Sequence, residues 1–208
     1  MKIILIVGEA LCVCGLVILQ IWHSDTFAMF PGAIALLWIM GSSMNRGETV
    51  ESLGLYNPAK NEAIQICFAG VLALSGFLAF VAKLNFVSLP TTENFTLLVL
   101  GYAVKYYPWA LFQQLILNGY FAKRFLEATD RPLYASILTG VIFSIVHLPN
   151  PILFSAGLLG GIASSAFFLK KRNLYLIALV HVVIGITIFY VIPRELHRGM
   201  IVGPRFFR

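Results

Sequence analysis

The stretch MKIILIVGEALCVCGLVILQIW, residues 1–22, is a long apolar run that decides the fold class. The run is about as long as a bilayer is thick, and no small-x-small cleavage site follows it. Glu9 inside the run also disfavours a cleavable signal sequence. We therefore predict a retained transmembrane helix, because an isolated span can satisfy its backbone polar groups in lipid only as a helix.

The composition extends this prediction to the whole chain of 208 residues. Hydrophobic residues make up 59% of it and charged residues 12%, with a mean hydropathy of +0.87. Soluble domains are nearer half apolar and a quarter charged, so lipid must be the solvent for most of this chain. The predicted fold class is all-α, a polytopic transmembrane helical bundle of about seven spans. The expected spans lie near 3–22, 27–44, 63–83, 96–121, 133–149, 151–170 and 174–193.

Polar stretches between these runs predict the organisation of the chain. The longest, NRGETVESLGLYNPAKNE at residues 45–62, is expected at the membrane surface. Small residues recur in the sixth run, SAGLLGGIASSAFF, and would let neighbouring backbones approach closely. We expect N-terminal transmembrane helices at 1–45, a surface loop at 46–62, a transmembrane core at 63–193 and a basic tail at 194–208.

The net charge of +6 resides in short loops and in the tail. Cations in these places meet lipid headgroups and set topology, so membrane lipid is an expected partner and nucleic acid is not. The loop cations favour an N-terminus on the inside, while the side of the C-terminus stays open. The three cysteines, Cys12, Cys14 and Cys67, have no metal-ligand spacing and are expected to be buried as small hydrophobes.

Polar side chains inside apolar spans are costly and need a partner or a purpose. Gln114 and Asn118 are four residues apart and share a helix face, whereas Gln113 is rotated by about 100°. His147 is expected to end the fifth span, and His181 lies midway along the last. The sequence leaves open whether Glu9 pairs with Lys105. The full set is Glu9, Lys105, Gln113, Gln114, Asn118, His147 and His181.

Two interpretations of these residues compete. Interhelical hydrogen bonds of about 0.6–2 kcal/mol each would account for any one of them. Two intramembrane histidines together with a cluster of amides favour a functional site.

The order and spacing of these residues resemble the CPBP family of intramembrane proteases, which includes CAAX prenyl endopeptidase-like and bacteriocin-processing enzymes. That family carries EExxxR followed by Gly, then FxxxH, then HxxxN on successive helices. The first motif corresponds to QQLILNG, with Gln113 and Gln114 at the glutamates, Asn118 at the arginine and Gly119 matching.

The other two motifs complete the resemblance. FSIVH, from Phe143 to His147, matches the second motif fully and is followed by LPNP. HVVIG keeps His181 of the third motif and has Gly185 in place of the asparagine. The resemblance covers roughly residues 50 to 190 and implies that the core is CPBP-like and lies in a bacterial inner membrane.

In this family the first glutamate and the FxxxH histidine are thought to activate a water molecule. The last histidine and the asparagine would stabilise the oxyanion, and the second glutamate and the arginine would shape the site. The resemblance thus implies His147 and His181 as catalytic residues of an active enzyme, supported by Phe143 and Gly119.

This chain departs from the family at four of the six polar positions: Gln113, Gln114, Asn118 and Gly185. Glutamine is not a base, and losing a general base costs a rate factor on the order of 10² to 10⁴. Losing an oxyanion donor costs on the order of 10² more. Zinc needs at least three protein ligands and only two histidines remain, so neither a metal nor another cofactor is expected.

Three classes of function follow. The first is a catalytically impaired pseudoprotease that binds another membrane protein or a transmembrane peptide as a scaffold subunit. The second is an active intramembrane endopeptidase of the CAAX-processing type that uses His147 and His181. The third, a small transporter or channel, fits the polar interior, but the chain lacks a pair of interrupted helical repeats.

Overall fold

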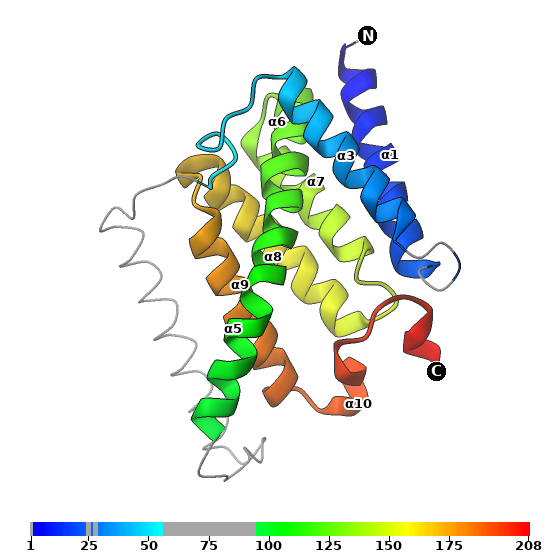
Figure 1. The fold of residues 1–208 in the computed structure, drawn as a ribbon, viewed down its shortest axis with the longest axis vertical. Coiled ribbons are helices and arrows are strands. Elements are labelled where there is room, and N and C mark those ends of the chain that lie inside the picture. The colour runs from blue at the N-terminus through cyan, green and yellow to red at the C-terminus, as the bar shows by residue number, and fades with distance from the viewer. Residues whose placement is uncertain (1, 24–25, 27–28, 56–94) are drawn as a thin grey trace.

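The computed structural model describes residues 2–23, 26, 29–55 and 95–208, and all regular structure in these ranges is helical (Figure 1). The predicted all-α bundle is therefore confirmed. The expected span at 63–83, Cys67 and the end of the surface loop lie outside the described residues.

The helices follow the predicted runs closely. Proline within the first turn begins α3, α7 and α8, while Asn150 and Asn173 cap α8 and α9 by accepting hydrogen bonds from backbone N–H groups. The bounds are α1 Lys2–Trp22, α3 Phe30–Asn45, α5 Phe95–Gln114, η1 Leu115–Ala122, α6 Lys123–Thr129, α7 Pro132–Ile145, α8 Pro151–Lys171, α9 Leu174–Val191, α10 Arg194–His197, η2 Arg198–Met200 and η3 Gly203–Phe207.

Among the described residues, three helices are long and apolar enough to cross a membrane by themselves. They are α1 from Ile3, α8 and α9. Helix α7 is apolar but shorter, with 14 residues. The large apolar side chains on the outer surfaces of these helices, such as Leu11 and Leu159, are exposed, as is expected of a protein surrounded by lipid.

Two local predictions were wrong. Helix α7 ends at Ile145, so His147 lies in the following turn and does not end the helix. The sequence LPNP explains this early end, because proline lacks an N–H group and disfavours helical backbone in the residue before it. Residues 115–122 form a π-helix, which continues α5 into α6 with a wider turn than the α-helix expected there.

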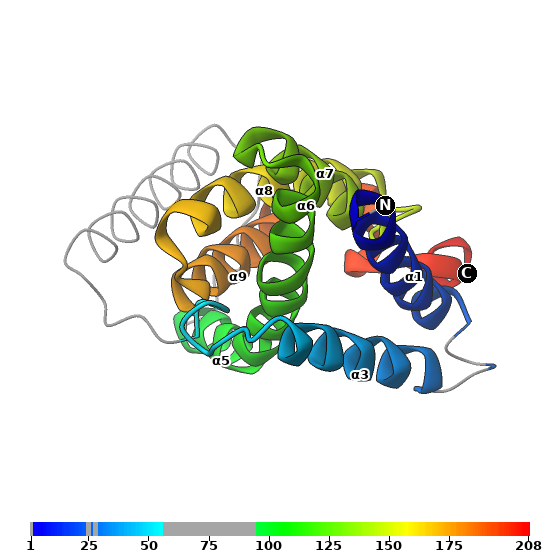
Figure 2. The same cartoon turned by 90° about the horizontal axis from the view of Figure 1, so that it is seen from above.

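The continuous rod α5–η1–α6 runs through the middle of the bundle. Seen from above, the pair α1–α3 lies on one side of it and the pair α8–α9 on the other (Figure 2). Helices α7 and α8 pack most closely, since a Cβ atom added at Gly161 would lie 2.8 Å from Cα of Gly140. The small residues of the sixth run thus allow the close backbone approach that was predicted.

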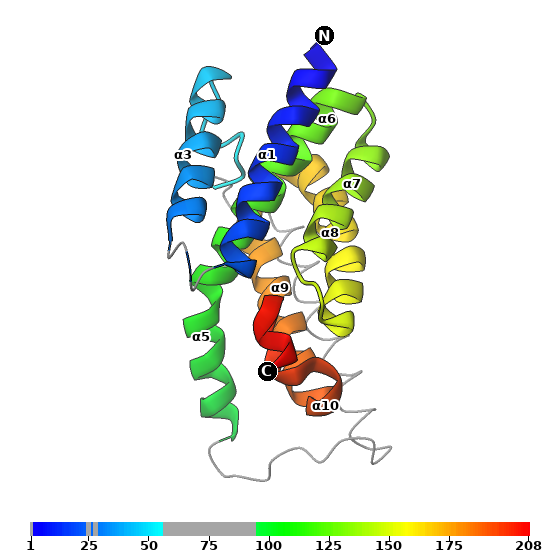
Figure 3. The ribbon, with the colours of Figure 1, turned by 90° about the vertical axis from the view of Figure 1, so that its right-hand side faces the viewer.

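The two chain termini lie at opposite ends of the bundle (Figures 1 and 3). The tail folds back against the turn between α7 and α8, where the Asn150 amide donates to the carbonyls of His197 (2.8 Å) and Ile201 (3.1 Å). The N–H group of Gly203 also donates to the carbonyl of Leu148 at 2.9 Å. The tail is therefore part of the folded unit.

An ionic cluster joins the N-terminal helices to α6, and it corrects the suggested pairing of Glu9 with Lys105. Glu9 pairs instead with Arg46 at 2.7 Å and lies 3.6 Å from Arg124, whereas Lys105 is exposed on α5. Arg46 follows α3 directly, which places its cation beside the acid of α1. The complete ionic cluster consists of Glu9, Arg46, Glu48, Lys123, Arg124 and Glu127.

The cysteine prediction was half right in the described residues. Cys14 is buried, whereas Cys12 is exposed on α1. The reason is helical geometry. Side chains two positions apart on a helix point to different faces, and only one of these faces of α1 contacts the bundle.

Candidate functional site

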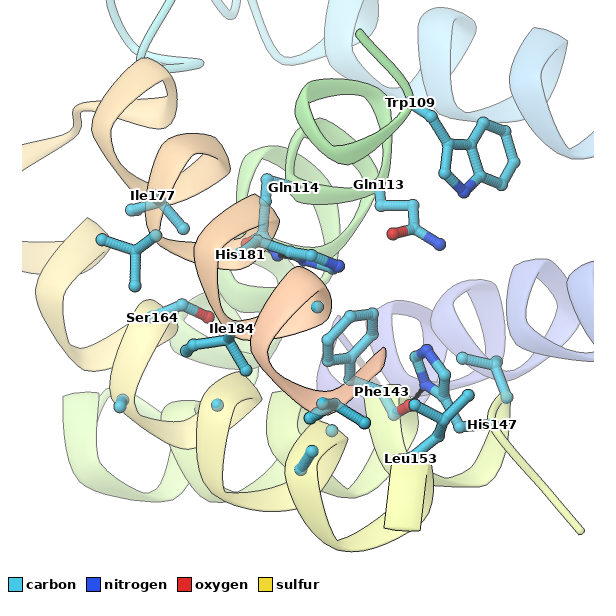
Figure 4. Close-up of a pocket in the computed structure, with 18 of the residues that line it drawn as sticks. Trp109, Gln113, Gln114, Phe143, His147, Leu153, Ser164, Ile177, His181 and Ile184 are labelled. Carbon is cyan, nitrogen blue, oxygen red and sulfur yellow. Dashed lines mark hydrogen bonds between the residues drawn. The ribbon is translucent and has the colours of Figure 1, made fainter. Parts of the chain in front are cut away.

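A cavity of about 490 Å³ lies between α5, α7, α8 and α9 (Figure 4). Ile21 of α1 and the tail residues Met200 and Val202 complete its wall. None of the described residues that line it is acidic, and none is lysine or arginine. The predicted site residues at the cavity are Gln113, Gln114, Phe143, His147, His181 and Gly185.

His147 presents one ring nitrogen to the cavity. Its Nδ1 lies 2.6 Å from the backbone carbonyl oxygen of Phe143, a contact in which the ring nitrogen must be the donor. A neutral imidazole then carries its lone pair on Nε2. Gly157 provides the room, since a Cβ there would lie 3.3 Å from Nδ1 of His147.

The ring of Phe143 separates the two histidines. Its centroid lies 4.6 Å from that of His147 and 5.7 Å from that of His181, both in edge-to-face geometry (Figure 4). The FxxxH motif thus brings its phenylalanine and histidine together, as its spacing of four suggested. The two imidazoles share a cavity but make no direct hydrogen bond.

A chain of hydrogen-bonded polar side chains begins on α8, passes through His181 and ends at Tyr106. The hydroxyl of Ser165 donates to Oδ1 of Asn118 at 2.8 Å, and the amide of Asn118 donates to Oε1 of Gln114 at 2.6 Å. The amide of Gln114 lies 2.7 Å from Nδ1 of His181, and Nε2 of His181 lies 2.9 Å from the hydroxyl of Tyr106. We refer to these five residues as the polar chain.

The polar chain accounts for two of the degenerate motif positions. Gln114 and Asn118 share a face as predicted, although Asn118 is fully buried behind Gln114 and does not line the cavity. Both amides are hydrogen-bonded to neutral groups, so their burial needs no countercharge. These hydrogen-bonded side chains are arranged as in a functional site, yet none of them carries a permanent charge.

Gln113 stands outside the polar chain. It projects from α5 toward the cavity beside Trp109 (Figure 4). Its Oε1 is buried and has no hydrogen-bond partner among the described residues. A buried acceptor without a partner is uncommon and marks a place where a ligand or water would bind.

The two motif glycines differ in their surroundings. Gly119 is buried in η1, where an added Cβ would lie 3.0 Å from Cδ1 of Leu115, so it serves packing. Gly185 faces the cavity, and an added Cβ would lie 2.9 Å from Cε1 of Tyr106. The ring of Tyr106 therefore fills the space that a larger residue at position 185 would need.

Sequence reasoning missed Tyr106, Ser165 and the ionic cluster. Tyr106 lies seven residues before Gln113, two turns along the same helix, and this spacing was its signal. For the ionic cluster the signal was Glu9 itself, an acid in an apolar run that needed a cation nearby.

In the described ranges, no group of three or more His, Cys, Asp or Glu side chains is placed to hold a metal ion. His147 directs its Nδ1 to a backbone carbonyl and His181 uses both ring nitrogens in the polar chain.

These features define a class: a helical membrane protein with a largely apolar, uncharged cavity between its helices, on which a few polar side chains converge. Residues 94–187 match the family model described as type II CAAX prenyl endopeptidase Rce1-like. This stretch belongs to the CPBP family, and the chain is an integral membrane protein. No curated protein and no solved structure matches the chain.

Proposed function

We propose that this CPBP protease-like protein is catalytically impaired and binds an apolar peptide segment of another membrane protein in its cavity. The observation that supports the proposal is the hydrogen bonding of Gln114. Its amide is engaged on both sides, by Asn118 and by His181, and no carboxylate lines the cavity within the described residues. A water molecule in the cavity therefore lacks the carboxylate–histidine pair that would take its proton.

The dimensions and lining of the cavity suit such a segment. Apolar side chains from α5, α7, α8 and α9 form most of the wall, and a few polar groups converge on it. Ligand sites commonly combine an apolar lining with a small number of placed polar groups. In this proposal the amides and histidines orient the bound segment through hydrogen bonds and perform no proton transfer.

Site-directed photocrosslinking in native membranes tests this function. A benzophenone amino acid at Ile184 would lie in the cavity wall, while the same group at Leu159 would lie on the exposed face of α8. We expect a discrete protein or peptide adduct at position 184 and lipid adducts alone at position 159. Identical lipid-only adducts at both positions would refute the proposal.

One observation supports the alternative of an active endopeptidase. Nε2 of His147 carries its lone pair toward the cavity, so this histidine has the geometry of a base even without a carboxylate. Incubation of the purified protein with a farnesylated CAAX peptide decides between the two functions. Cleavage that His147→Ala abolishes would establish the alternative, and no cleavage favours the binding protein.

The proposal also includes an orientation, with the N-terminus inside a bacterial inner membrane. Helix α6 and the end of α3 lie toward the end of the bundle that holds the N-terminus (Figure 1). The cations in and next to these segments are Arg46, Lys123, Arg124 and Arg131. Short loops rich in lysine and arginine remain on the cytoplasmic side. Labelling of a single cysteine introduced at Arg131 with an impermeant maleimide tests this: we expect reaction only after the membrane is opened.

A further inference from the structure

The polar chain has a direction, which follows from the groups at its start. Ser165 donates to Oδ1 of Asn118, and the Asn118 amide donates to Oε1 of Gln114. The Gln114 amide nitrogen, which is only a donor, therefore donates to Nδ1 of His181. A neutral imidazole that accepts at Nδ1 bears its proton on Nε2 and donates it to the oxygen of Tyr106. The hydroxyl proton of Tyr106 is left without an acceptor among the described residues.

Tyr106 also occupies the space next to Gly185, the position at which the family motif has an asparagine. Its ring lies against Gly185, with Cε1 2.9 Å and the hydroxyl oxygen 3.4 Å from the site of a Cβ atom. An asparagine at 185 would bring an amide donor into this same space. The glycine and the tyrosine are therefore complementary. Gly185 lacks the amide donor that an asparagine would carry, and Tyr106 places its hydroxyl donor in the space that the asparagine side chain would occupy.

The remaining polar groups of the cavity restrict the chemistry of a ligand. Tyr106 offers a hydrogen-bond donor and Gln113 offers a buried acceptor, Oε1, without a partner among the described residues. No described lining residue carries a permanent charge. An ionised ligand would thus enter an apolar cavity without a counterion, at a large cost in desolvation.

We propose that Tyr106 is the ligand-contacting donor of this cavity, in place of the missing asparagine, and that it binds a neutral backbone carbonyl of an apolar peptide. This inference rests on the proposed function and specifies it. The peptide N–H group would donate to Oε1 of Gln113. The rest of the polar chain positions Tyr106, because it holds the Nε2 proton of His181 toward the phenolic oxygen.

Binding of a radiolabelled, uncharged probe, N-acetyl-leucyl-leucine methylamide, tests the inference with the full chain in mild detergent. We expect saturable binding to the parent protein and about fivefold weaker binding to Tyr106→Phe, the effect of one net hydrogen bond. The matched control is Tyr107→Phe, since the hydroxyl of Tyr107 donates to the carbonyl of Tyr175 at 3.1 Å and lies outside the cavity. Its affinity should not change.

A second variant protects the test against loss of structure. Tyr106→Ala combined with Gly185→Asn moves the donor from α5 to α9 and should recover the affinity that Tyr106→Ala alone loses. The free acid, N-acetyl-leucyl-leucine, should bind more weakly than the methylamide. No saturable binding to the parent, or equal affinity in the parent and Tyr106→Phe, would overturn the inference.

These outcomes separate the inference from the proposed function. If photocrosslinking captures a peptide at Ile184 while Tyr106→Phe binds the probe as the parent does, the binding function stands and the donor assignment fails. If the parent hydrolyses the probe, the proposed function fails. In that case the hydrolysis rates of the parent and of Tyr106→Phe are compared, and equal rates would exclude Tyr106 as the ligand-contacting donor.

Discussion

Arg124 of α6 donates a hydrogen bond to Glu48 across 2.8 Å, in a contact from which water is nearly excluded. Only 1% of the Arg124 side chain and 7% of the Glu48 side chain are exposed. Lys123 approaches the same carboxylate at 2.8 Å. This pair fastens the segment after α3 to the central rod and so helps hold α1 and α3 beside the core.

Replacing Glu48 with glutamine should lower the free energy of unfolding by about 3 kcal/mol, because it removes the nearer counterion of the buried Arg124 guanidinium and leaves only Glu9, 3.6 Å away. Reversible unfolding in mixed detergent micelles would measure the loss. Glu51→Gln is the matched control, since Glu51 is exposed three residues along the chain. Equal stability of the two variants would contradict this role for Glu48.

The same carboxylate predicts a dependence of stability on pH. Burial acts to raise the pKa of Glu48, but hydrogen bonds from Arg124, Lys123 and Ser43 outweigh it and lower the pKa from 4.5 to about 2. Because the pKa is lower in the folded state, the carboxylate contributes its full stabilisation above pH 4.5 and loses it as the pH falls toward 2.

Thermal unfolding of the parent and of Glu48→Gln across this range would test the pH dependence. The difference between their unfolding midpoints should be constant above about pH 5 and should narrow as the acid is protonated. A difference that widens on acidification would have the wrong sign for a lowered pKa.

The close packing of α7 on α8 makes a prediction about two glycines. A Cβ atom at Gly140 would lie 2.7 Å from the carbonyl oxygen of Leu158 and 2.9 Å from the backbone N of Ile162. Backbone atoms cannot move aside as a side chain can, so Gly140→Ala should destabilise the protein by about 1–3 kcal/mol.

Gly160→Ala is the control for this packing. It lies on α8, and a Cβ there meets no described atom within 4 Å, so alanine should raise stability by about 0.5–1 kcal/mol through its helix preference. Opposite signs at the two positions are expected. A neutral Gly140→Ala would show that the helices can separate without cost.

Much of this architecture was predictable because lipid restricts a chain to helices. Apolar runs located α1, α8 and α9, and the spacing of four brought Gln114 to Asn118 and Phe143 to His147. The stretch with the motifs also matched its family. The length of the apolar runs and the helical spacing were sufficient for the helices and for these two contacts, whereas the family followed from the order of the motifs.

The rest depended on contacts between distant segments. Nothing in the sequence distinguishes the π-helical turns of η1 from an α-helix, since both leave the same apolar pattern. Glu9 found Arg46 instead of Lys105 because α1 and α3 run side by side, a pairing that composition does not specify. Tyr106 escaped notice because its role depends on Gly185, which is 79 residues away in sequence.

The complementarity of Tyr106 and Gly185 leads to the last prediction, a double-mutant cycle. Gly185→Asn alone should cost about 1–3 kcal/mol of stability, because the new side chain must displace the Tyr106 ring. In a Tyr106→Ala background the same substitution enters an emptied space and should cost much less. The two changes should therefore be coupled by about 1 kcal/mol or more.

Unfolding free energies of the parent, both single variants and the double variant give this coupling. Gly160→Asn is the control, because it also adds an amide to the cavity wall and its Cβ atom meets no described atom within 4 Å, so its effect should be additive with Tyr106→Ala. Additivity at Gly185 as well would show that the tyrosine does not hold the asparagine's place. Coupling has a functional consequence: the combined changes Gln113→Glu, Gln114→Glu, Asn118→Arg and Gly185→Asn should not produce a peptidase while Tyr106 remains, because its ring occupies the space that the fourth side chain needs.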